Sequence, residues 1–210
     1  KVAYIMEGDT PSFLGLIENG LGWSVSPGFG GWGGRYVLYR SYAETRPIWT
    51  NNHYSRDTVK INDKHYTSDQ ATIWRWRKAF QHDFAARMDW CISDDYSKAN
   101  HNPIVILNGN QTKEVLYLNT GPGSTINFSA KQSHDPDDDK ISYQWLIYRE
   151  AGNYRHPIEL SHSEGIETSL TLSNKKSPSS ANKIHLILIA EDNGEPSLTS
   201  YRRAVITVNN

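Results

Sequence analysis

The sequence of 210 residues predicts a mixed α and β segment over residues 1–102, followed by an antiparallel immunoglobulin-like β-sandwich over residues 103–210. The second half contains seven strand-length segments and no helical period, which is typical of a sandwich of about 100 residues. Turn signals such as Asn193-Gly194 separate the segments, and Ile126 and Phe128 alternate with polar neighbours. The expected strands are 104–107, 114–118, 124–130, 141–149, 168–172, 183–191 and 202–208.

The first half is less regular. We expect a buried strand at Lys1–Met6, a short helix over residues 12–19 that begins after Thr10 and Pro11, and a short strand at 36–39. Five glycines within residues 28–34 predict a loop in which the backbone approaches its neighbours closely. Residues 41–66 show no clear period, so we expect a long loop there.

Residues 67–92 predict a long helix. Thr67 and Gln70 have the spacing of a capping box at its start. Apolar residues then recur at helical spacing, and we expect this stripe to be buried, with its cysteine an inert core thiol. The stripe consists of Ile73, Trp76, Phe80, Phe84, Met88 and Cys91.

Composition excludes several classes of protein. The net charge is −1, which excludes a broad basic surface for nucleic acid or an anionic membrane, and no apolar run approaches the ~20 residues of a membrane span. One cysteine, Cys91, allows no internal disulfide. Because the chain enters a strand-like run directly at its first residues, we expect it to be a fragment or a processed chain.

The second half resembles the polycystic-kidney-disease (PKD) and cadherin-like sandwich modules. The resemblance rests on Ser133–Asp139, on Tyr143–Trp145, which places a tryptophan in mid-strand, and on Ala190–Gly194. Such modules often accompany secreted enzymes that act on polysaccharides, so the resemblance implies a secreted or periplasmic protein.

The first half resembles a bacterial family of nucleoside-hydrolase-related, cellulose-binding proteins. The motifs that carry the resemblance are Glu7–Leu14, Gly31–Tyr36, Asp69–Arg77 and Asp83–Cys91. The resemblance implies that residues 1–102 are the end of a nucleoside-hydrolase-like α/β domain, and that the rest of this N-terminal domain is a partner of the chain.

The same resemblance suggests Asp9 as a metal ligand. Nucleoside hydrolases have a His-Asp-Pro segment here, in which the Asp binds calcium and the His assists the leaving base. Asp9 matches the calcium ligand, but Gly8 stands at the position of the His and transfers no proton. Asp9 is alternatively a carboxylate that stabilises the start of the following helix.

A second candidate calcium site is the acidic turn with Asp135, Asp137 and Asp139. Alternating carboxylates in a tight loop wrap one calcium ion, and Asp192 approaches from another strand end in this hypothesis. The alternative is an Asp-Pro-Asp turn whose carboxylates accept hydrogen bonds from nearby backbone N–H groups.

Aromatic residues gather in the loops of the first half. Exposed rings on rigid loops form a surface that stacks on sugars, and the alternative is packing of an irregular domain edge. The arginines of these loops either bind a carboxylate or phosphate group or, as we favour, form ion pairs with Glu44 or Asp57. They are Arg35, Arg40, Arg46 and Arg56. The predicted carbohydrate-binding residues are Trp23, Trp32, Tyr36, Trp49 and Tyr54.

Together these features predict a secreted, carbohydrate-associated protein that binds cellulose or a plant cell-wall glycan through loop aromatics, with calcium as a candidate cofactor. We expect neither nucleic acid nor a membrane as partner. One alternative is a calcium-dependent hydrolase of N-ribosides or glycosides, for which this chain alone would be inactive. Another alternative is that the sandwich is a spacer without a ligand.

Overall fold

The computed structural model describes residues 10–40, 43–176 and 182–209. The expected strand at Lys1–Met6 lies outside these residues. The chain divides into two compact units, Lys1–Phe80 and Gln81–Asn210. Most of the long helix α3 belongs to the second unit, where His82 Nδ1 lies 2.8 Å from the carbonyl oxygen of Ser197. The predicted domain boundary between residues 102 and 103 is not tested by this division into compact units, and it stays a prediction.

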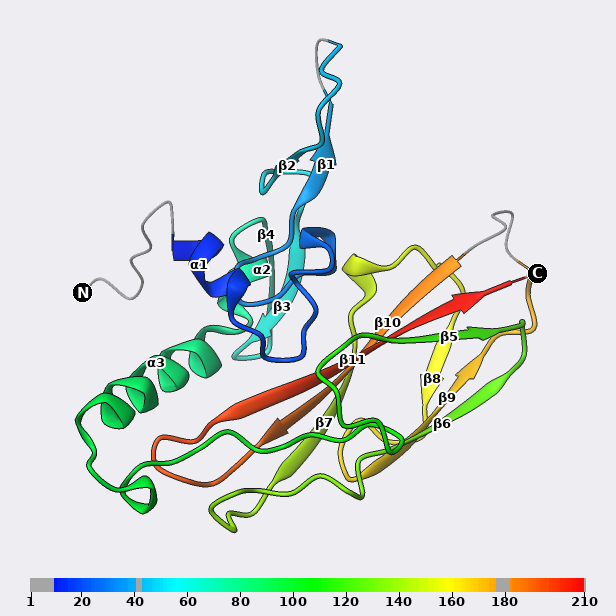
Figure 1. The fold of residues 1–210 in the computed structure, drawn as a ribbon. Helices are drawn as coiled ribbons and strands as arrows, with labels where there is room; N and C mark the ends of the chain where they lie inside the picture. The colour runs from blue at the N-terminus through cyan, green and yellow to red at the C-terminus, as the bar shows by residue number, and fades with distance from the viewer. Residues whose placement is uncertain (1–9, 41–42, 177–181, 210) are drawn as a thin grey trace. The chain divides into compact units, whose positions relative to one another are not determined.

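The first unit contains short helices and two small antiparallel sheets, β1–β2 and β3–β4 (Figure 1). The chain order is α1 (Thr10–Leu16), η1 (Pro27–Phe29), β1 (Val37–Tyr39), β2 (Ile48–Thr50), β3 (Asp57–Ile61), β4 (Lys64–Ser68), α2 (Ala71–Trp74) and the start of α3 (Arg77–Ile92).

The glycine-rich loop of this unit is packed as closely as the sequence predicts. A Cβ atom on Gly33 would lie 2.2 Å from the carbonyl oxygen of Pro11, a distance that leaves room only for glycine. Trp32 within it and Leu21 are fully buried, and Ile73 is buried as well. The loop is therefore part of the core of the first unit.

The long loop predicted at residues 41–66 is wrong, because three strands lie in or extend from this segment. They are three to five residues long and mostly exposed, so they lack the alternation that marks a half-buried strand. β3 and β4 are joined at Asn62 and Asp63, whose φ angles of 47° and 61° define a tight hairpin turn.

The single helix predicted over residues 67–92 is also wrong. Thr67 belongs to β4, where its hydroxyl lies 2.9 Å from that of Thr58, and Gln70 precedes α2 without a side-chain cap. The helical segment is divided into α2 and α3. The predicted capping box is thus absent because both of its residues serve the β3–β4 hairpin and the turn that follows.

The predicted buried stripe holds only for its first residues. Ile73 and Trp76 are buried, but Phe84 and Met88 are exposed and so is Cys91. In α3 the buried positions are Asp83 and Ala86. The break between α2 and α3 interrupts the helical period, so the inward face changes. Among the described residues, no helix has the length and apolar content that crossing a membrane requires.

The second unit contains the predicted sandwich, whose fold class the structure confirms. One sheet has the order β5-β11-β10-β7 and the other the order β6-β9-β8. β5 runs parallel to β11, and the other pairs are antiparallel. The strands are β5 (Leu116–Thr120), β6 (Thr125–Ser129), β7 (Ser142–Ile147), β8 (Ile158–Leu160), β9 (Glu167–Leu172), β10 (Asn182–Glu191) and β11 (Thr199–Val208).

The two sheets enclose one apolar core. Phe128, Trp145, Leu170, Leu188 and Ile206 lie in it, one from each of five strands. The mid-strand tryptophan expected at 145 is a core ring, and its indole N–H donates to the carbonyl oxygen of Gly165 at 2.8 Å. This core is built from the inward-facing positions of the alternating strands.

Two details of the predicted sandwich are wrong. Residues 104–107 form no named strand, because only isolated bridges, Ile104 to His134 and Leu107 to Asn110, occur there. β8 was not predicted, since its three residues are too few to show alternation. The remaining six strand predictions overlap observed strands.

Candidate functional site

The five predicted sugar-binding aromatics are not equally accessible. Trp32 is only 1% exposed, so its ring packs in the core and presents no surface to a ligand. The prediction for Trp32 is therefore corrected.

Trp23 and Tyr36 are half-buried and support the loop. The indole N–H of Trp23 donates to the carbonyl oxygen of Gly34 at 3.0 Å, and its ring meets Tyr36 edge-on with centroids 5.9 Å apart. A Cβ on Gly15 would collide with the Trp23 ring at 2.7 Å. Burial also raises the pKa of the Tyr36 hydroxyl. These contacts fit a structural role for both rings.

Trp49 lies on the β1–β2 hairpin and is 40% exposed. Its ring packs over Gly28 of η1, since a Cβ there would lie 3.3 Å from Trp49 Cζ3. η1 is itself held to the start of β1 by a 3.0 Å hydrogen bond from the Tyr36 N–H to the Pro27 carbonyl. Trp49 is therefore a supported ring with part of its surface open.

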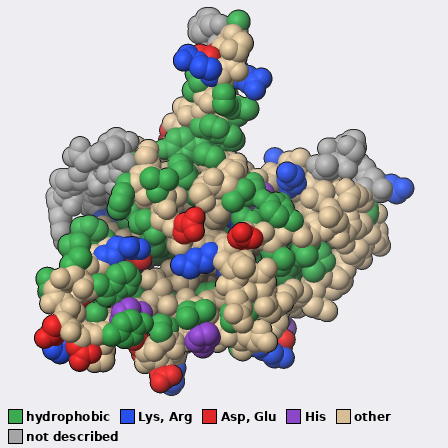
Figure 2. All heavy atoms as spheres, in the orientation of Figure 1, with side chains coloured by type: hydrophobic (Ala, Val, Ile, Leu, Met, Phe, Trp, Pro, Cys, Tyr) green, Lys and Arg blue, Asp and Glu red, His purple; other side chains and the backbone are tan. Residues whose placement is uncertain are grey.

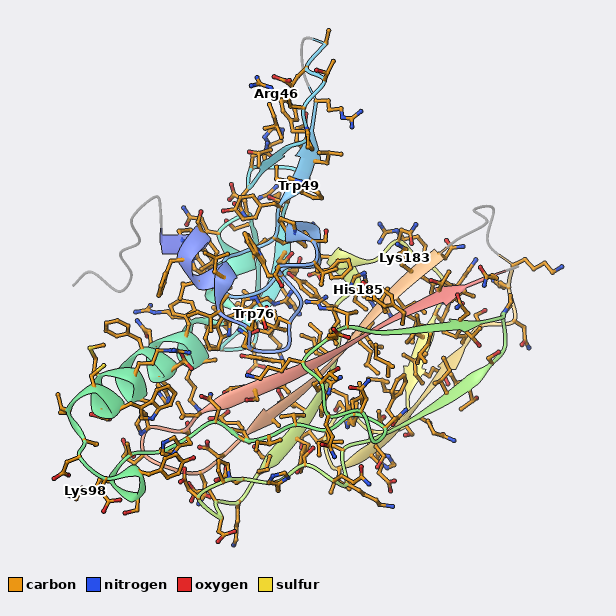
Figure 3. The ribbon with its side chains drawn as sticks, viewed as in Figure 1. Arg46, Trp49, Trp76, Lys98, Lys183 and His185 are labelled. Carbon is orange, nitrogen blue, oxygen red and sulfur yellow. The ribbon has the colours of Figure 1, made fainter. Side chains whose placement is uncertain are left out.

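The hairpin around Trp49 is apolar on both faces. Leu38 is paired directly with Trp49, and Tyr39 with Ile48, so one pair lies on each face. All four side chains are exposed. Figure 2 shows hydrophobic side chains gathered along this hairpin, and Figure 3 shows Trp49 and Arg46 on it. Such an exposed apolar patch indicates an interaction surface.

Tyr54 is the most exposed of the predicted rings, at 64%. It lies in a tight turn in which its own N–H donates to Asn52 Oδ1 at 2.9 Å. The His53 ring contacts it with centroids 3.9 Å apart. Tyr54 is thus available to a ligand on a turn that hydrogen bonds hold in place.

Two of the loop arginines, Arg35 and Arg46, form the ion pairs expected from the sequence, and Arg75 adds a third pair. Arg46 pairs with Glu44 at the exposed end of the hairpin, at 2.8 Å. Arg35 and Arg75 pair with the two oxygens of the fully buried Asp57, at 2.9 and 2.7 Å. The second group is a structural cluster at the base of β3.

The acidic turn of the second unit is organised around the buried carboxylate of Asp135. Its Oδ1 accepts the N–H groups of Asp137 at 2.8 Å and Asp139 at 3.3 Å, the pattern of the Asp-Pro-Asp turn. The Asp137 carboxylate accepts the N–H of His101 at 2.7 Å. Burial, followed by the charges of Asp135 and Asp137, raises the pKa of Asp139.

Asp192 at the end of β10 is buried near this turn, and Asn100 donates to its Oδ1 at 3.1 Å. Asn100 was not predictable as a partner of Asp192, because the two residues are 92 positions apart along the chain. Within the ranges that the structure describes, no three His, Cys, Asp or Glu side chains gather at a metal-binding distance. Calcium binding by Asp135, Asp137 and Asp139 stays a prediction, and Asp9 lies outside the described residues.

Two family models match parts of this chain. A model of the nucleoside hydrolase-like domain of cellulose-binding Sde182 matches residues 1–36. A model of the C-terminal domain of cellulose-binding protein Sde0182 matches residues 125–208. Both units of the chain match the Sde182 family of cellulose-binding proteins. The family resemblance predicted from the sequence motifs is confirmed.

One solved structure is similar to almost the whole chain. It is a nucleoside hydrolase-related protein from Saccharophagus degradans that is associated with carbohydrate metabolism, 34% identical over 98% of this chain, with a TM-score of 0.78. The match covers 48% of that protein, so this chain spans about half of its relative's length.

Other solved structures are similar to only about half of this chain. An endo-fucoidan hydrolase of glycoside hydrolase family 107 is 15% identical, over 52% of this chain and 14% of its own, with a TM-score of 0.31. The PKD domain of the KIAA 1837 protein is 16% identical, over 45% and 81%, with a TM-score of 0.31. These scores are too low to support a conclusion. No curated protein sequence matches the chain.

Proposed function

We propose that the chain is part of a protein that binds cellulose or a related plant cell-wall glycan, and that Trp49 on the β1–β2 hairpin is the centre of its binding surface. Both family matches are to domains of cellulose-binding proteins. The observation that carries the location is the exposed Trp49 ring, which is supported from one side by Gly28.

The hairpin has the chemistry that a neutral glucan requires. A pyranose ring presents a flat C–H surface, and an indole supplies a large, rigid apolar area for it. The support under Trp49 means that little side-chain freedom is lost on binding. Arg46, which lies farther along the hairpin (Figure 3), and its ion-pair partner Glu44 supply polar groups for hydroxyls.

Tyr54 extends this proposal as a second exposed ring of the same unit. Trp23 and Tyr36 contribute indirectly, because their edge-on contact and the hydrogen bond of Trp23 hold the loop that precedes β1. We assign them a positioning role. Substitution of either residue is then expected to change stability before it changes affinity for glycan.

The proposal extends to the partner and the location of the protein. We propose that the exposed Phe13 and Leu16 of α1 contact the remaining part of a nucleoside-hydrolase-like domain, because this chain spans about half of its relative's length. Because plant cell-wall glycans lie outside the cell, a protein that binds them acts after export, in the periplasm or the medium.

The test is depletion of the purified protein from solution by microcrystalline cellulose, across a range of cellulose concentrations. Trp49→Ala removes the stacking surface and is expected to weaken binding roughly 5- to 30-fold, which corresponds to about 1–2 kcal/mol. Tyr54→Ala is expected to weaken it less, because the second ring adds a smaller area.

Tyr117→Ala is the matched control, since Tyr117 is also an exposed tyrosine ring, on β5 of the other unit. Near-ultraviolet circular dichroism confirms that each variant is folded. The location is refuted if Trp49→Ala and Tyr54→Ala bind cellulose like the unaltered chain. If the unaltered chain stays in the supernatant, cellulose binding by this chain is refuted and the spacer alternative is favoured.

A further inference from the structure

A hollow lined by aromatic rings lies in the segment that follows α3. Its volume is about 280 Å³, and its lining includes Trp90 near the end of α3, Tyr96 of η2 (Tyr96–Lys98) and His101. Figure 3 labels Lys98 in this segment. All of these residues belong to the second unit, so the hollow is formed without the β1–β2 hairpin. Its size is near the lower limit for pockets that bind small molecules.

The three rings are parallel and form an aromatic stack. The Tyr96 and His101 rings have centroids 3.6 Å apart at an interplanar angle of 3°. The Trp90 and His101 rings have centroids 5.7 Å apart at the same angle. One face of Tyr96 therefore lies on His101, yet the residue is 62% exposed, so its open area is the ring edge and the opposite face. The stack thus offers one flat aromatic surface.

Contacts at the ring edges fix the aromatic stack. The indole N–H of Trp90 donates to the carbonyl oxygen of Asn100 at 2.7 Å. His101 Nδ1 lies 3.2 Å from both oxygens of the Asp137 carboxylate, which also accepts the backbone N–H of His101 at 2.7 Å. Because His101 is held in this way and Tyr96 lies flat on it, a ligand that binds to Tyr96 costs little side-chain entropy.

Two carboxylates border the hollow, those of Asp94 and Asp95. Asp95 Oδ1 accepts the N–H of Ser97 at 3.0 Å and the hydroxyl of Ser97 at 2.9 Å. These hydrogen bonds lower the pKa of Asp95, so its side chain is ionised at neutral pH. Asp94 pairs with Lys98 at 2.6 Å, and its side chain is 82% exposed. Because an ionised carboxylate is only an acceptor, this border suits a ligand that donates hydrogen bonds.

A flat ring beside carboxylates favours a sugar over a cation. A pyranose presents a flat C–H surface to an aromatic ring and carries hydroxyl donors around its edge. A quaternary ammonium ligand is instead recognised by an aromatic cage, in which rings contact it from several sides. The parallel rings of the aromatic stack do not form such a cage.

We propose that this hollow is a second glycan site, which binds a short stretch of a single, soluble glucan chain. Tyr96 stacks on the sugar, and Asp94 and Asp95 accept hydrogen bonds from its hydroxyls. The choice of a glucan rests on the proposed function, whereas the location rests on the aromatic stack alone. A hollow admits a free chain but does not fit a flat crystalline surface, so its ligand differs in physical form from that of the β1–β2 hairpin. Since one ring provides a small contact area, the expected dissociation constant is on the order of 1 mM.

The test is titration of the ¹⁵N-labelled chain with cellotetraose, followed by NMR through the indole N–H signals of its seven tryptophans. Trp90→Phe assigns the Trp90 signal by its loss, and Trp49→Phe assigns the Trp49 signal in the same way. The Trp90 signal is expected to shift with a dissociation constant on the order of 1 mM. The Trp49 signal reports the hairpin separately.

Variants of Tyr96 locate the ligand. Tyr96→Ala removes the flat surface and is expected to weaken the binding that the Trp90 signal reports roughly 5- to 20-fold. Tyr96→Phe keeps the ring and should bind within about 2-fold of the unaltered chain. Tyr117→Ala is the control, because it removes an exposed tyrosine ring from β5 of the same unit and should leave the titration unchanged. Near-ultraviolet circular dichroism checks that each variant is folded.

Three results overturn the inference. The first is a Trp90 signal that does not move with cellotetraose up to about 10 mM. The second is an equal response in Tyr96→Ala, which places the sugar elsewhere. The third is a Trp90 signal that moves with choline and not with cellotetraose, which makes the hollow a cation site. None of these results bears on depletion by microcrystalline cellulose, and failure of that assay leaves the Trp90 titration readable.

Discussion

Asp57 is the residue whose substitution should most disturb the first unit. It is fully buried, and its two oxygens pair with Arg35 Nε at 2.9 Å and with Arg75 Nη1 at 2.7 Å. Asp57→Asn keeps the size of the side chain but leaves two guanidinium groups without their negative partner. Breaking a buried ion pair in this way costs about 3–5 kcal/mol. Because the Arg75 side chain is 13% exposed, water relieves part of the loss, and we expect a cost near the lower limit.

The measurement is urea-induced unfolding followed by tryptophan fluorescence, which reports this unit because most of the tryptophans lie in it. A lower midpoint with an unchanged slope is expected. Asp63→Asn is the matched control: it makes the same chemical change in the same hairpin, at an exposed pair with Lys60, and should leave the midpoint unchanged. If Asp57→Asn also leaves the midpoint unchanged, the buried pair does not hold the unit together and the reasoning is refuted.

Three further predictions concern single positions. Gly33→Ala should lower Tm strongly, since its Cβ meets a backbone carbonyl at 2.2 Å, whereas Gly31→Ala, whose Cβ has 3.5 Å of room, should change Tm little; equal effects would contradict the packing argument. Trp145→Phe should cost about 2–3 kcal/mol in urea unfolding, because it leaves a cavity and an unpaired Gly165 carbonyl. Burial and a nearby guanidinium lower the pKa of His185 to about 3, so stability should fall by up to about 1.4 kcal/mol per pH unit as pH drops from 6.5 toward 3, and His185→Asn should reduce that slope.

The sandwich was predictable because its strands are long enough to show their burial in the sequence. β10 and β11 each have ten residues, and the alternation around Ile126 and Phe128 corresponds to one inward and one outward face. The turn chemistry between strands was equally visible. β8 was not predictable, since three residues cannot establish a period.

The first unit was predictable only in part, because much of its structure depends on contacts between distant segments. β2, β3 and β4 are short and exposed, and only the Asn62-Asp63 turn gave a local signal of their hairpin. Trp32 and Trp49 both lie in aromatic loops, and nothing in their local sequence separates the buried ring from the exposed one. The exposed fractions of the two rings differ because of tertiary packing, which places Trp32 in the core and Trp49 against Gly28 at the surface.

The surroundings of Asp135 and Asp192 were also not predictable from the sequence, because they depend on contacts between distant segments. Asp135 and Asp192 were recognisable as acidic residues beside turns, but the role of Asn100 depends on a contact across 92 residues. The hydrogen bonds that occupy one oxygen of each carboxylate could not be read from spacing. That Asp135 Oδ2 and Asp192 Oδ2 are buried without a hydrogen-bond partner among the described residues likewise became apparent only in the structure.

The parallel pairing of β5 with β11 has a mechanical consequence. Leu116 to Thr120 pair in register with Ala204 to Val208. Tension applied to the chain before β5 and after β11 pulls these two strands in opposite directions along their shared axis, so all hydrogen bonds of the ladder are loaded at once and cannot open one by one. A protein anchored to a fibre through its first unit would transmit force through this ladder, and single-molecule pulling should show one high-force rupture for the sandwich rather than a gradual extension.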